Sequence, residues 1–156
     1  MIVISDTGPL NYLIRLEAAG VLPALYETVT VPDAVRQEML HPHAPEVVQA
    51  WAARLPTWAV LRQPQSLLPL ALDAGERAAI SLAFEVCADL VLIDERRGRQ
   101  EAQAQNLKTI GTLGILVDAA RSDLLDLTDA LARLQQINFY VSEALVQTLL
   151  AAQASE

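Results

Sequence analysis

The chain has 156 residues, of which 53% are hydrophobic, and its formal net charge is −8. This length suits one domain with a single core, and this hydrophobic content excludes a disordered chain. No apolar run reaches the roughly 18 residues that cross a bilayer, and the N-terminus lacks the basic start of a signal peptide. One cysteine excludes an internal disulfide. We therefore expect a soluble cytoplasmic protein that folds as one domain over residues 1–156.

The acidic balance argues against a nonspecific nucleic-acid binder, because such proteins are normally basic. It does not exclude an enzyme that acts on nucleic acid, since carboxylates that bind metal ions add negative charge where the ions later cancel it. Three of the basic residues crowd together at Arg96, Arg97 and Arg99. A local basic patch is therefore compatible with the acidic chain.

The first half of the chain alternates short apolar runs with amphipathic segments. Three apolar runs predict strands, the last of them at a sheet edge: residues 1–4, 28–31 and 58–61. The helical patterns run from near Pro9 to Gly20, and over residues 21–26, 33–40 and 46–54. Residues 63–70 contain two prolines and form a connector, which we expect to be the most mobile stretch.

The second half is more regular. Two further strands are predicted over residues 90–93 and 107–110. The first of them is wholly apolar, which fits a central strand of a parallel sheet. Helical patterns cover residues 73–87, 94–105, 112–120, 126–135 and 142–153. Strands that alternate with helices predict an α/β fold, in which a central parallel sheet carries helices on both faces.

Four acidic residues occupy positions from which their carboxylates can meet at one edge of such a sheet and form a ligand-binding site. Ligands of open parallel sheets bind beyond the carboxyl ends of the strands. Asp6 ends the first strand and Asp94 ends the strand over residues 90–93, whereas Glu38 and Glu76 lie on helices. Four oxygen donors without a Cys or His cluster suit Mg²⁺ or Mn²⁺ rather than zinc. Such ions support phosphodiester cleavage, so the set predicts a phosphoryl-transfer site.

Each of these acids also has a structural interpretation. Asp6 and Asp94 precede helices and fit the role of N-caps. Glu76 stands three residues after Asp73, which is the spacing of a capping box. Glu38 alone would be a solvated helix residue. The functional interpretation therefore depends on the whole set.

Other reactive residues give weaker signals. His41 and His43 lie in a loop without Cys partners, and we expect them to be exposed. Cys87 is expected in the core, since no Cys/His constellation accompanies it. The sequence has no phosphate-binding loop of the G-x-x-x-x-G-K-[ST] type and no G-x-G-x-x-G after a strand, so it does not support use of ATP or a dinucleotide.

Five segments of the chain resemble the motifs of the PIN-domain family, in matching order over about residues 1–140. They are Val3–Leu10, Val31–Glu38, Leu72–Ala83, Leu92–Arg99 and Gly111–Gly114. The sequence is most similar to a bacterial and archaeal PIN-like branch related to VapC-type toxins, which has Gly-Glu where many toxins have an aspartate. The resemblance implies a three-layer α/β/α sandwich, Mg²⁺ or Mn²⁺, and cleavage of single-stranded RNA.

The resemblance also implies roles for particular residues. Asp6 and Asp94 would bind the main metal, and Glu38 and Glu76 would complete its shell or activate water. Glu95 is an alternate ligand, and Thr112 would help to order the metal site. The proposed RNA contacts are arginines close to these motifs: Arg77, Arg96, Arg97 and Arg99.

Partners follow from the same resemblance. Toxins of this kind are held by a small antitoxin, and the apolar positions at the end of the chain favour that contact or a homodimer: Leu145, Val146, Leu149 and Leu150. Two other functions stay open. The first is a noncatalytic module that binds RNA or protein, and the second is an α/β domain that forms a phosphoaspartate.

Overall fold

The computed structural model describes residues 1–139 and 142–154. The chain divides into two compact units, residues 1–112 and 113–156, which are described separately below. Within the described residues, no helix is both long and apolar enough to span a membrane.

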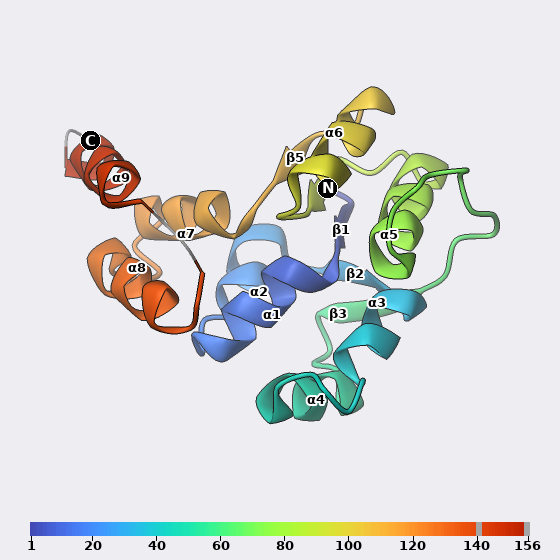
Figure 1. The fold of residues 1–156 in the computed structure, drawn as a ribbon, viewed down its shortest axis with the longest axis horizontal. Coiled ribbons are helices and arrows are strands. Elements are labelled where there is room, and N and C mark those ends of the chain that lie inside the picture. Colours follow the sequence, from blue (N-terminus) through green and yellow to red (C-terminus); the bar gives the residue numbers. More distant parts are fainter. Residues whose placement is uncertain (140–141, 155–156) are drawn as a thin grey trace. The chain divides into compact units, whose positions relative to one another are not determined.

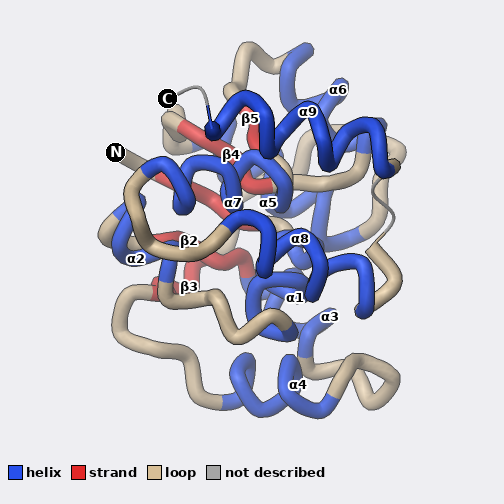
Figure 2. Tube along the Cα trace, turned by 90° about the vertical axis from the view of Figure 1, so that its left-hand side faces the viewer, coloured by secondary structure: helices blue, strands red, loops and turns tan. Residues whose placement is uncertain are grey.

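The first unit is built on a parallel sheet of five strands in the order β3-β2-β1-β4-β5 (Figures 1 and 2). Its strands are β1 Val3–Ser5, β2 Val29–Pro32, β3 Ala59–Arg62, β4 Leu90–Leu92 and β5 Thr109–Ile110. The predicted edge strand, β3, pairs only with β2, and the apolar strand β4 lies between β1 and β5. The predicted α/β fold with a central parallel sheet is therefore confirmed.

Helices flank this sheet. They are α1 Thr7–Arg15, α2 Val21–Tyr26, α3 Asp33–Met39, α4 Glu46–Ala53, α5 Ala74–Glu85 and α6 Arg96–Ala104. The chain runs outward from β1 to β3, then returns past β1 to β4 and β5. Because crossovers between parallel strands are right-handed, this reversal sends α1, which follows β1, and α5, which leads to β4, to opposite faces of the sheet. Figure 1 shows α1 and α5 on opposite sides of β1.

Helix α1 places the chain's first turn against the core. Its buried stripe is formed by Pro9, Leu10, Leu13 and Ile14, which recur at helical spacing. The helix begins at Thr7 rather than near Pro9 as predicted. Proline is tolerated there because an N–H in the first turn has no intrahelical acceptor.

The connector between β3 and α5 is fixed to α5 by three hydrogen bonds. Glu85 Oε1 accepts from the backbone N–H of Gln65 (2.8 Å), and Ser81 Oγ accepts from that of Leu68 (2.9 Å). Arg77 Nε donates to the carbonyl oxygen of Leu68 (2.7 Å). The segment that we expected to be the most mobile is thus anchored along the helix.

Cys87 departs from its predicted place in the core. It is exposed, and it follows α5 with a φ of 52°. The helix ends at Glu85, two residues before the predicted end, and the buried face stops with it. The left-handed backbone at Cys87 turns the chain toward β4.

The second unit is helical. It contains most of α7 (Thr112–Arg121), together with α8 (Leu127–Gln136) and α9 (Glu143–Ala154), and α9 packs against α8. Along α9, Leu145 is exposed while Val146, Leu149 and Leu150 are half-buried. Val141, which directly precedes the predicted helix over residues 142–153, lies outside the described residues.

Candidate metal centre

The ends of two adjacent strands bring Asp6 and Asp94 to one edge of the sheet. Strands β1 and β4 are parallel neighbours, with Ser5 opposite Leu92. The backbone N–H of Asp6 donates to the carbonyl oxygen of Leu92 (2.9 Å), and Asp94 follows two residues later. The predicted placement of both acids at the carboxyl ends of neighbouring strands is confirmed.

Asp6 is buried with an unsatisfied carboxylate. Its side chain is 5% exposed, and Oδ1 has no hydrogen-bond partner among the described residues. Asp6 stands at the N-cap position of α1 but makes no side-chain cap hydrogen bond, so the capping interpretation is wrong. Burial is the largest cause that raises the pKa of Asp6 to about 7. The backbone hydrogen bond of Thr7 opposes this rise, and the negative charges of Asp73, Glu38 and Asp94 add to it.

Glu38 is held between two helix starts rather than in solvent. The Thr7 hydroxyl donates to Glu38 Oε2 (2.5 Å), and the backbone N–H of Gly75 donates to Oε1 (2.8 Å). A Cβ at position 75 would lie 2.6 Å from both carboxylate oxygens, so only glycine permits this approach. The carboxylate therefore sits at the N-terminus of α5, where a helix favours negative charge.

Asp73 joins this group, although the sequence analysis did not select it. One carboxylate oxygen from each of Asp6, Glu38 and Asp73 lies within 4.8 Å of the others. Asp73 Oδ1 also accepts from the backbone N–H of Glu76 (2.8 Å), which is the expected N-cap bond. The cap bond uses only Oδ1 of this carboxylate. Aspartate, unlike serine or threonine, leaves a second, negatively charged oxygen for a cation.

Glu76 lies in the first turn of α5, three residues after Asp73. It is 7% exposed, and its pKa is raised to about 8, first by burial and then by a hydrogen bond with Asp73 and the charge of that residue. The charges of Asp6 and Glu95 add to this effect. A Cβ at Gly98 of α6 would lie 2.6 Å from Glu76 Oε2, so the absence of a side chain there makes room for the carboxylate.

Asp94 is bound by Thr112 rather than acting as the cap of α6. The backbone N–H and the hydroxyl of Thr112 donate to its two oxygens at 2.6 and 2.7 Å. The N-cap position of α6 belongs to Glu95, which makes no side-chain cap bond. Burial raises the pKa of Asp94, while the Thr112 hydrogen bonds and the charge of Arg99 oppose that rise. The Thr112 contact matches the ordering role implied by the family resemblance.

These five acids form what we call the carboxylate cluster: Asp6, Glu38, Asp73, Glu76 and Asp94. Asp6 interacts electrostatically with the other four, because the charges of Asp73, Glu38 and Asp94 raise its pKa and its own charge raises the pKa of Glu76. The cluster contains all four predicted acids and one that was missed. Only Asp6 and Glu38 of the predicted four belong to the tight group with Asp73.

The other candidate residues surround the cluster or lie away from it. Arg99 Nη1 donates to the Asp94 carbonyl oxygen (2.6 Å), and Arg77 binds the connector as described above. Arg96 and Arg97 are exposed in the first turn of α6, beside the exposed Glu95. His41 and His43 are exposed in their loop, as predicted.

The donor set suits a hard divalent cation. All its side-chain donors are carboxylate oxygens, which Mg²⁺ and Mn²⁺ prefer. A buried carboxylate oxygen without a hydrogen bond is costly, and a cation in contact with it would remove that cost. The residues present therefore fit a metal ion.

The comparisons with known proteins agree with this geometry. A family model described as DUF3368, PIN domain, matches residues 2–156. The fold is similar to that of a PilT N-terminus domain protein, SSO1118, from the hyperthermophilic archaeon Sulfolobus solfataricus P2, with a TM-score of 0.56 and 14% identity. That match covers 76% of this chain and 93% of the other. A search of curated proteins found no match. The chain belongs to the PIN-domain family.

Proposed function

We propose that this protein is a metal-dependent endoribonuclease that cleaves single-stranded RNA, and that it acts as the toxin of a toxin–antitoxin pair. The observation that carries the proposal is the buried Oδ1 of Asp6, which has no hydrogen-bond partner among the described residues and belongs to the carboxylate cluster. PIN domains are generally nucleases, and this chain is a member of the family. A module that only bound RNA or protein would gain nothing from four further acids around a buried carboxylate.

Asp6, Glu38 and Asp73 would hold one Mg²⁺ or Mn²⁺, since an oxygen from each already lies within 4.8 Å of the others. Asp94 and Glu76 would complete the ligand shell or bind a second ion. When bound, such a cation supplies Lewis-acid stabilisation of the charge on the phosphate and favours formation of a nucleophilic hydroxide from water.

Hydrogen bonds within the protein orient the metal-binding carboxylates, and one carboxylate is placed to accept a proton from water. The hydrogen bonds to Glu38 and Asp94 fix both carboxylates before any ligand arrives, which lowers the cost of reaching a reactive geometry. Glu76 has a pKa of about 8 and lies beside Asp73. Glu76 is the candidate base for the attacking water if Asp94 alone completes the ligand shell, because its carboxylate then stays free to accept a proton beside the metal ion.

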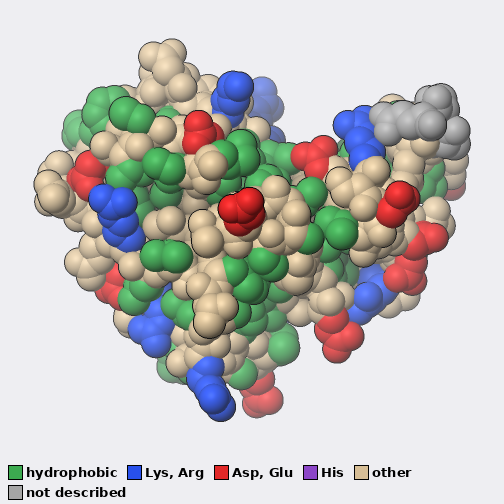
Figure 3. Space-filling model, turned by 180° about the vertical axis from the view of Figure 1, so that it is seen from behind, with side chains coloured by type: hydrophobic (Ala, Val, Ile, Leu, Met, Phe, Trp, Pro, Cys, Tyr) green, Lys and Arg blue, Asp and Glu red, His purple; other side chains and the backbone are tan. Residues whose placement is uncertain are grey.

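RNA has to approach an acidic protein. On the face drawn in Figure 3, basic side chains lie scattered among acidic ones, so the described residues offer no broad basic surface there. We infer that contact with phosphates depends on the arginines around α6, chiefly Arg96 and Arg97. Arg99 and Arg77 would contribute with the nitrogens that are not used on backbone carbonyls.

The toxin role requires a partner and a cytoplasmic location, and both belong to the proposal. The partners proposed are a small antitoxin or a second copy of this chain at α9, where Leu145 is 40% exposed. Sedimentation of the purified chain tests the second copy: a pure monomer at high concentration would remove the homodimer. Co-purification with the product of an adjacent short gene would identify the antitoxin.

Cleavage of a circular single-stranded RNA tests the activity, because only an endonuclease can open a circle. Mn²⁺ or Mg²⁺ should support cleavage, and EDTA should stop it. Asp6→Asn and Asp94→Asn should abolish it, whereas Asp118→Asn, at a half-exposed acid of α7, should not. Equal activity in Asp6→Asn and the wild-type protein would assign the cleavage to a contaminant and favour the noncatalytic module.

A further inference from the structure

A half-buried arginine, Arg99 of α6, lies beside the acid that follows β4. Its Nη1 donates to the carbonyl oxygen of Asp94 (2.6 Å). Burial raises the pKa of the Asp94 carboxyl, and the charge of Arg99 opposes this rise. A Cβ at Gly111 would lie 2.8 Å from Asp94 Oδ1 and 3.4 Å from Arg99 Nη1. The carboxylate and the guanidinium therefore border the same small space, which a side chain at position 111 would fill.

Arg99 has no acidic partner, although it lies next to the carboxylate cluster. Within residues 1–139 and 142–154, no carboxylate oxygen lies within 4 Å of its guanidinium nitrogens. A guanidinium has five N–H donors, and Arg99 directs one of them to a backbone carbonyl oxygen. A partly desolvated cation without a counter-ion is costly, and an anion in contact with it would remove that cost. The position of Arg99 therefore suits an anionic ligand.

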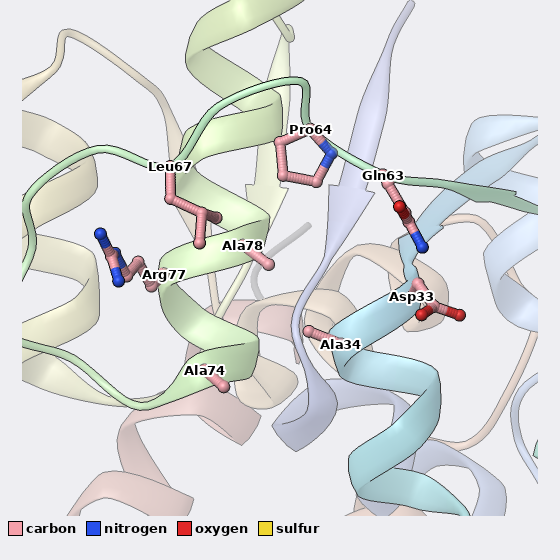
Figure 4. Close-up of a pocket in the computed structure, with 8 residues that line it drawn as sticks. All are labelled: Asp33, Ala34, Gln63, Pro64, Leu67, Ala74, Arg77 and Ala78. Carbon is pink, nitrogen blue, oxygen red and sulfur yellow. The ribbon is translucent and has the colours of Figure 1, made fainter.

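The other arginines near the cluster are placed differently. Arg96 and Arg97 are exposed in the first turn of α6. Arg77 lines a cavity between α3, α5 and the connector, and Figure 4 shows its guanidinium extending away from Ala34 of α3. This direction agrees with the hydrogen bond from Arg77 to the connector. These three arginines can contact RNA away from the cluster, whereas Arg99 is fixed beside a cluster acid.

We propose that Arg99 is a catalytic residue, and that its guanidinium binds a nonbridging oxygen of the phosphate at which the RNA is cleaved. Arginine matches the geometry of a phosphate and keeps its charge at every working pH. The reacting phosphate would then lie between Arg99 and the carboxylate cluster, whereas Arg96 and Arg97 only position the RNA. The inference rests on the proposed nuclease function and assigns one residue to the reacting group.

Arg99 stabilises charge in this reaction and transfers no proton. In hydrolysis the oxygen of water forms a bond to phosphorus, and the bond from phosphorus to one ribose oxygen breaks. That ribose oxygen gains one proton of the water, and the other proton remains on the new phosphate oxygen. Donors that are fixed before the reaction stabilise the charge that develops on the phosphate in the transition state. The bond to the Asp94 carbonyl oxygen fixes Arg99 in this way before RNA binds.

Phosphate binding tests this role without cleavage. Equilibrium dialysis with radiolabelled inorganic phosphate and Mg²⁺ should show about tenfold weaker binding to Arg99→Gln than to the wild-type protein. Calorimetric titration should show no loss of Mn²⁺ affinity in this variant, because the substitution removes a positive charge. Loss of Mn²⁺ affinity is expected instead if Arg99 only orders Asp94. Arg54→Gln makes the same change at the exposed arginine that ends α4, and it should leave phosphate binding unchanged.

A second variant guards against misfolding of the first. Arg99→Lys keeps the charge and a donor for the Asp94 carbonyl oxygen, and its phosphate affinity should lie between those of Arg99→Gln and the wild-type protein. No phosphate binding by the wild-type protein, equal phosphate affinity in all three folded proteins, or a parallel loss of Mn²⁺ affinity would overturn the role of Arg99.

Cleavage of single-stranded RNA with Mn²⁺ is measured separately. The kcat of Arg99→Gln should fall by about a hundredfold, which is more than KM rises. Cleavage with an unchanged kcat in Arg99→Gln leaves the nuclease and removes the catalytic role of Arg99. Phosphate binding that depends on Arg99, without cleavage by the wild-type protein, leaves the phosphate site and removes the nuclease.

Discussion

Thr112 donates two hydrogen bonds to the carboxylate of Asp94, one from its backbone N–H (2.6 Å) and one from its hydroxyl (2.7 Å). Both oxygens of Asp94 are thereby engaged at the point where the chain leaves β5. Thr112 is fully buried, so water does not replace these donors. The pair fixes one acid of the carboxylate cluster in a defined orientation.

Removal of the Thr112 hydroxyl tests the value of this contact. Thr112→Val keeps the branched shape but leaves one Asp94 oxygen without a donor, and we expect it to lower the free energy of unfolding by about 1–3 kcal/mol. Urea denaturation measures the change. Thr109→Val is the control, because it removes an exposed hydrogen bond from Gln103 (3.2 Å) and should change stability by less than about 0.5 kcal/mol. Equal effects of the two variants would contradict the special role of Thr112.

Asp73 is predicted to bind the metal ion in addition to capping α5. Asp73→Asn keeps an oxygen that can accept from the Glu76 N–H, since asparagine is an equally good cap. It removes a charged ligand, so calorimetric titration should show Mn²⁺ affinity reduced by about tenfold or more, with little change in melting temperature. Asp126→Asn makes the same change at the N-cap of α8 and should leave Mn²⁺ binding intact. If both variants bind Mn²⁺ like the wild-type protein, Asp73 is only a cap.

The metal-free protein should lose stability as pH rises. Folding raises the pKa of Asp6 from 3.8 to about 7 and that of Glu76 from 4.5 to about 8, so the folded state binds more protons than the unfolded state between these values. The stabilising effect of protonation is complete below about pH 4 and is lost as pH rises through 7 and 8.

Urea denaturation in EDTA at pH 5 and pH 8 measures this loss. Asp6→Asn removes one of the two buried charges and should raise the free energy of unfolding at pH 8 by on the order of 2 kcal/mol relative to the wild-type protein. Saturating Mg²⁺ should restore wild-type stability at pH 8 but have little effect on Asp6→Asn. A wild-type protein that is more stable in EDTA at pH 8 than at pH 5 would contradict the buried-charge account.

We predict that position 98 has to be glycine, because a larger residue would occupy the space of the Glu76 carboxylate. A Cβ at position 98 would lie 2.6 Å from Glu76 Oε2 and equally close to Ile93 Cδ1. Overpacking of this kind costs about 1–3 kcal/mol, which exceeds the roughly 1 kcal/mol that alanine gains over glycine in a helix. Gly98→Ala should therefore lower the melting temperature and the rate of Mn²⁺-dependent cleavage. Gly20→Ala has open space around its Cβ and should be neutral or stabilising, and equal behaviour of the two variants would refute the steric argument.

The sheet was predictable from the sequence because apolar periodicity and strand–helix alternation are local signals. The strand over residues 90–93 is wholly apolar, which predicted an interior position, and β4 is interior. Asp6 and Asp94 each end such a strand, so their shared edge followed from topology. Helix ends were less accurate, as at Thr7 and Cys87, because they depend on contacts that periodicity does not contain.

The inner shell of the site was harder to predict because its contacts join distant segments. Glu38 meets Gly75 across 37 positions, and Asp94 meets Thr112 across 18. Asp73 was not predicted as a site residue because its position before α5 is fully consistent with an N-cap. The same carboxylate both caps α5 and approaches Asp6. No local pattern distinguishes an aspartate that only caps a helix from one with its second oxygen directed toward a cation.

The position of the bound metal tests the central claim most directly. Crystals of the wild-type protein soaked in Mn²⁺ can be measured at a wavelength where manganese scatters anomalously. We expect a peak in contact with Oδ1 of Asp6, the buried oxygen without a hydrogen-bond partner among the described residues, and bounded by Glu38 and Asp73. A fully soaked crystal with no anomalous peak within coordination distance of Asp6 would contradict it.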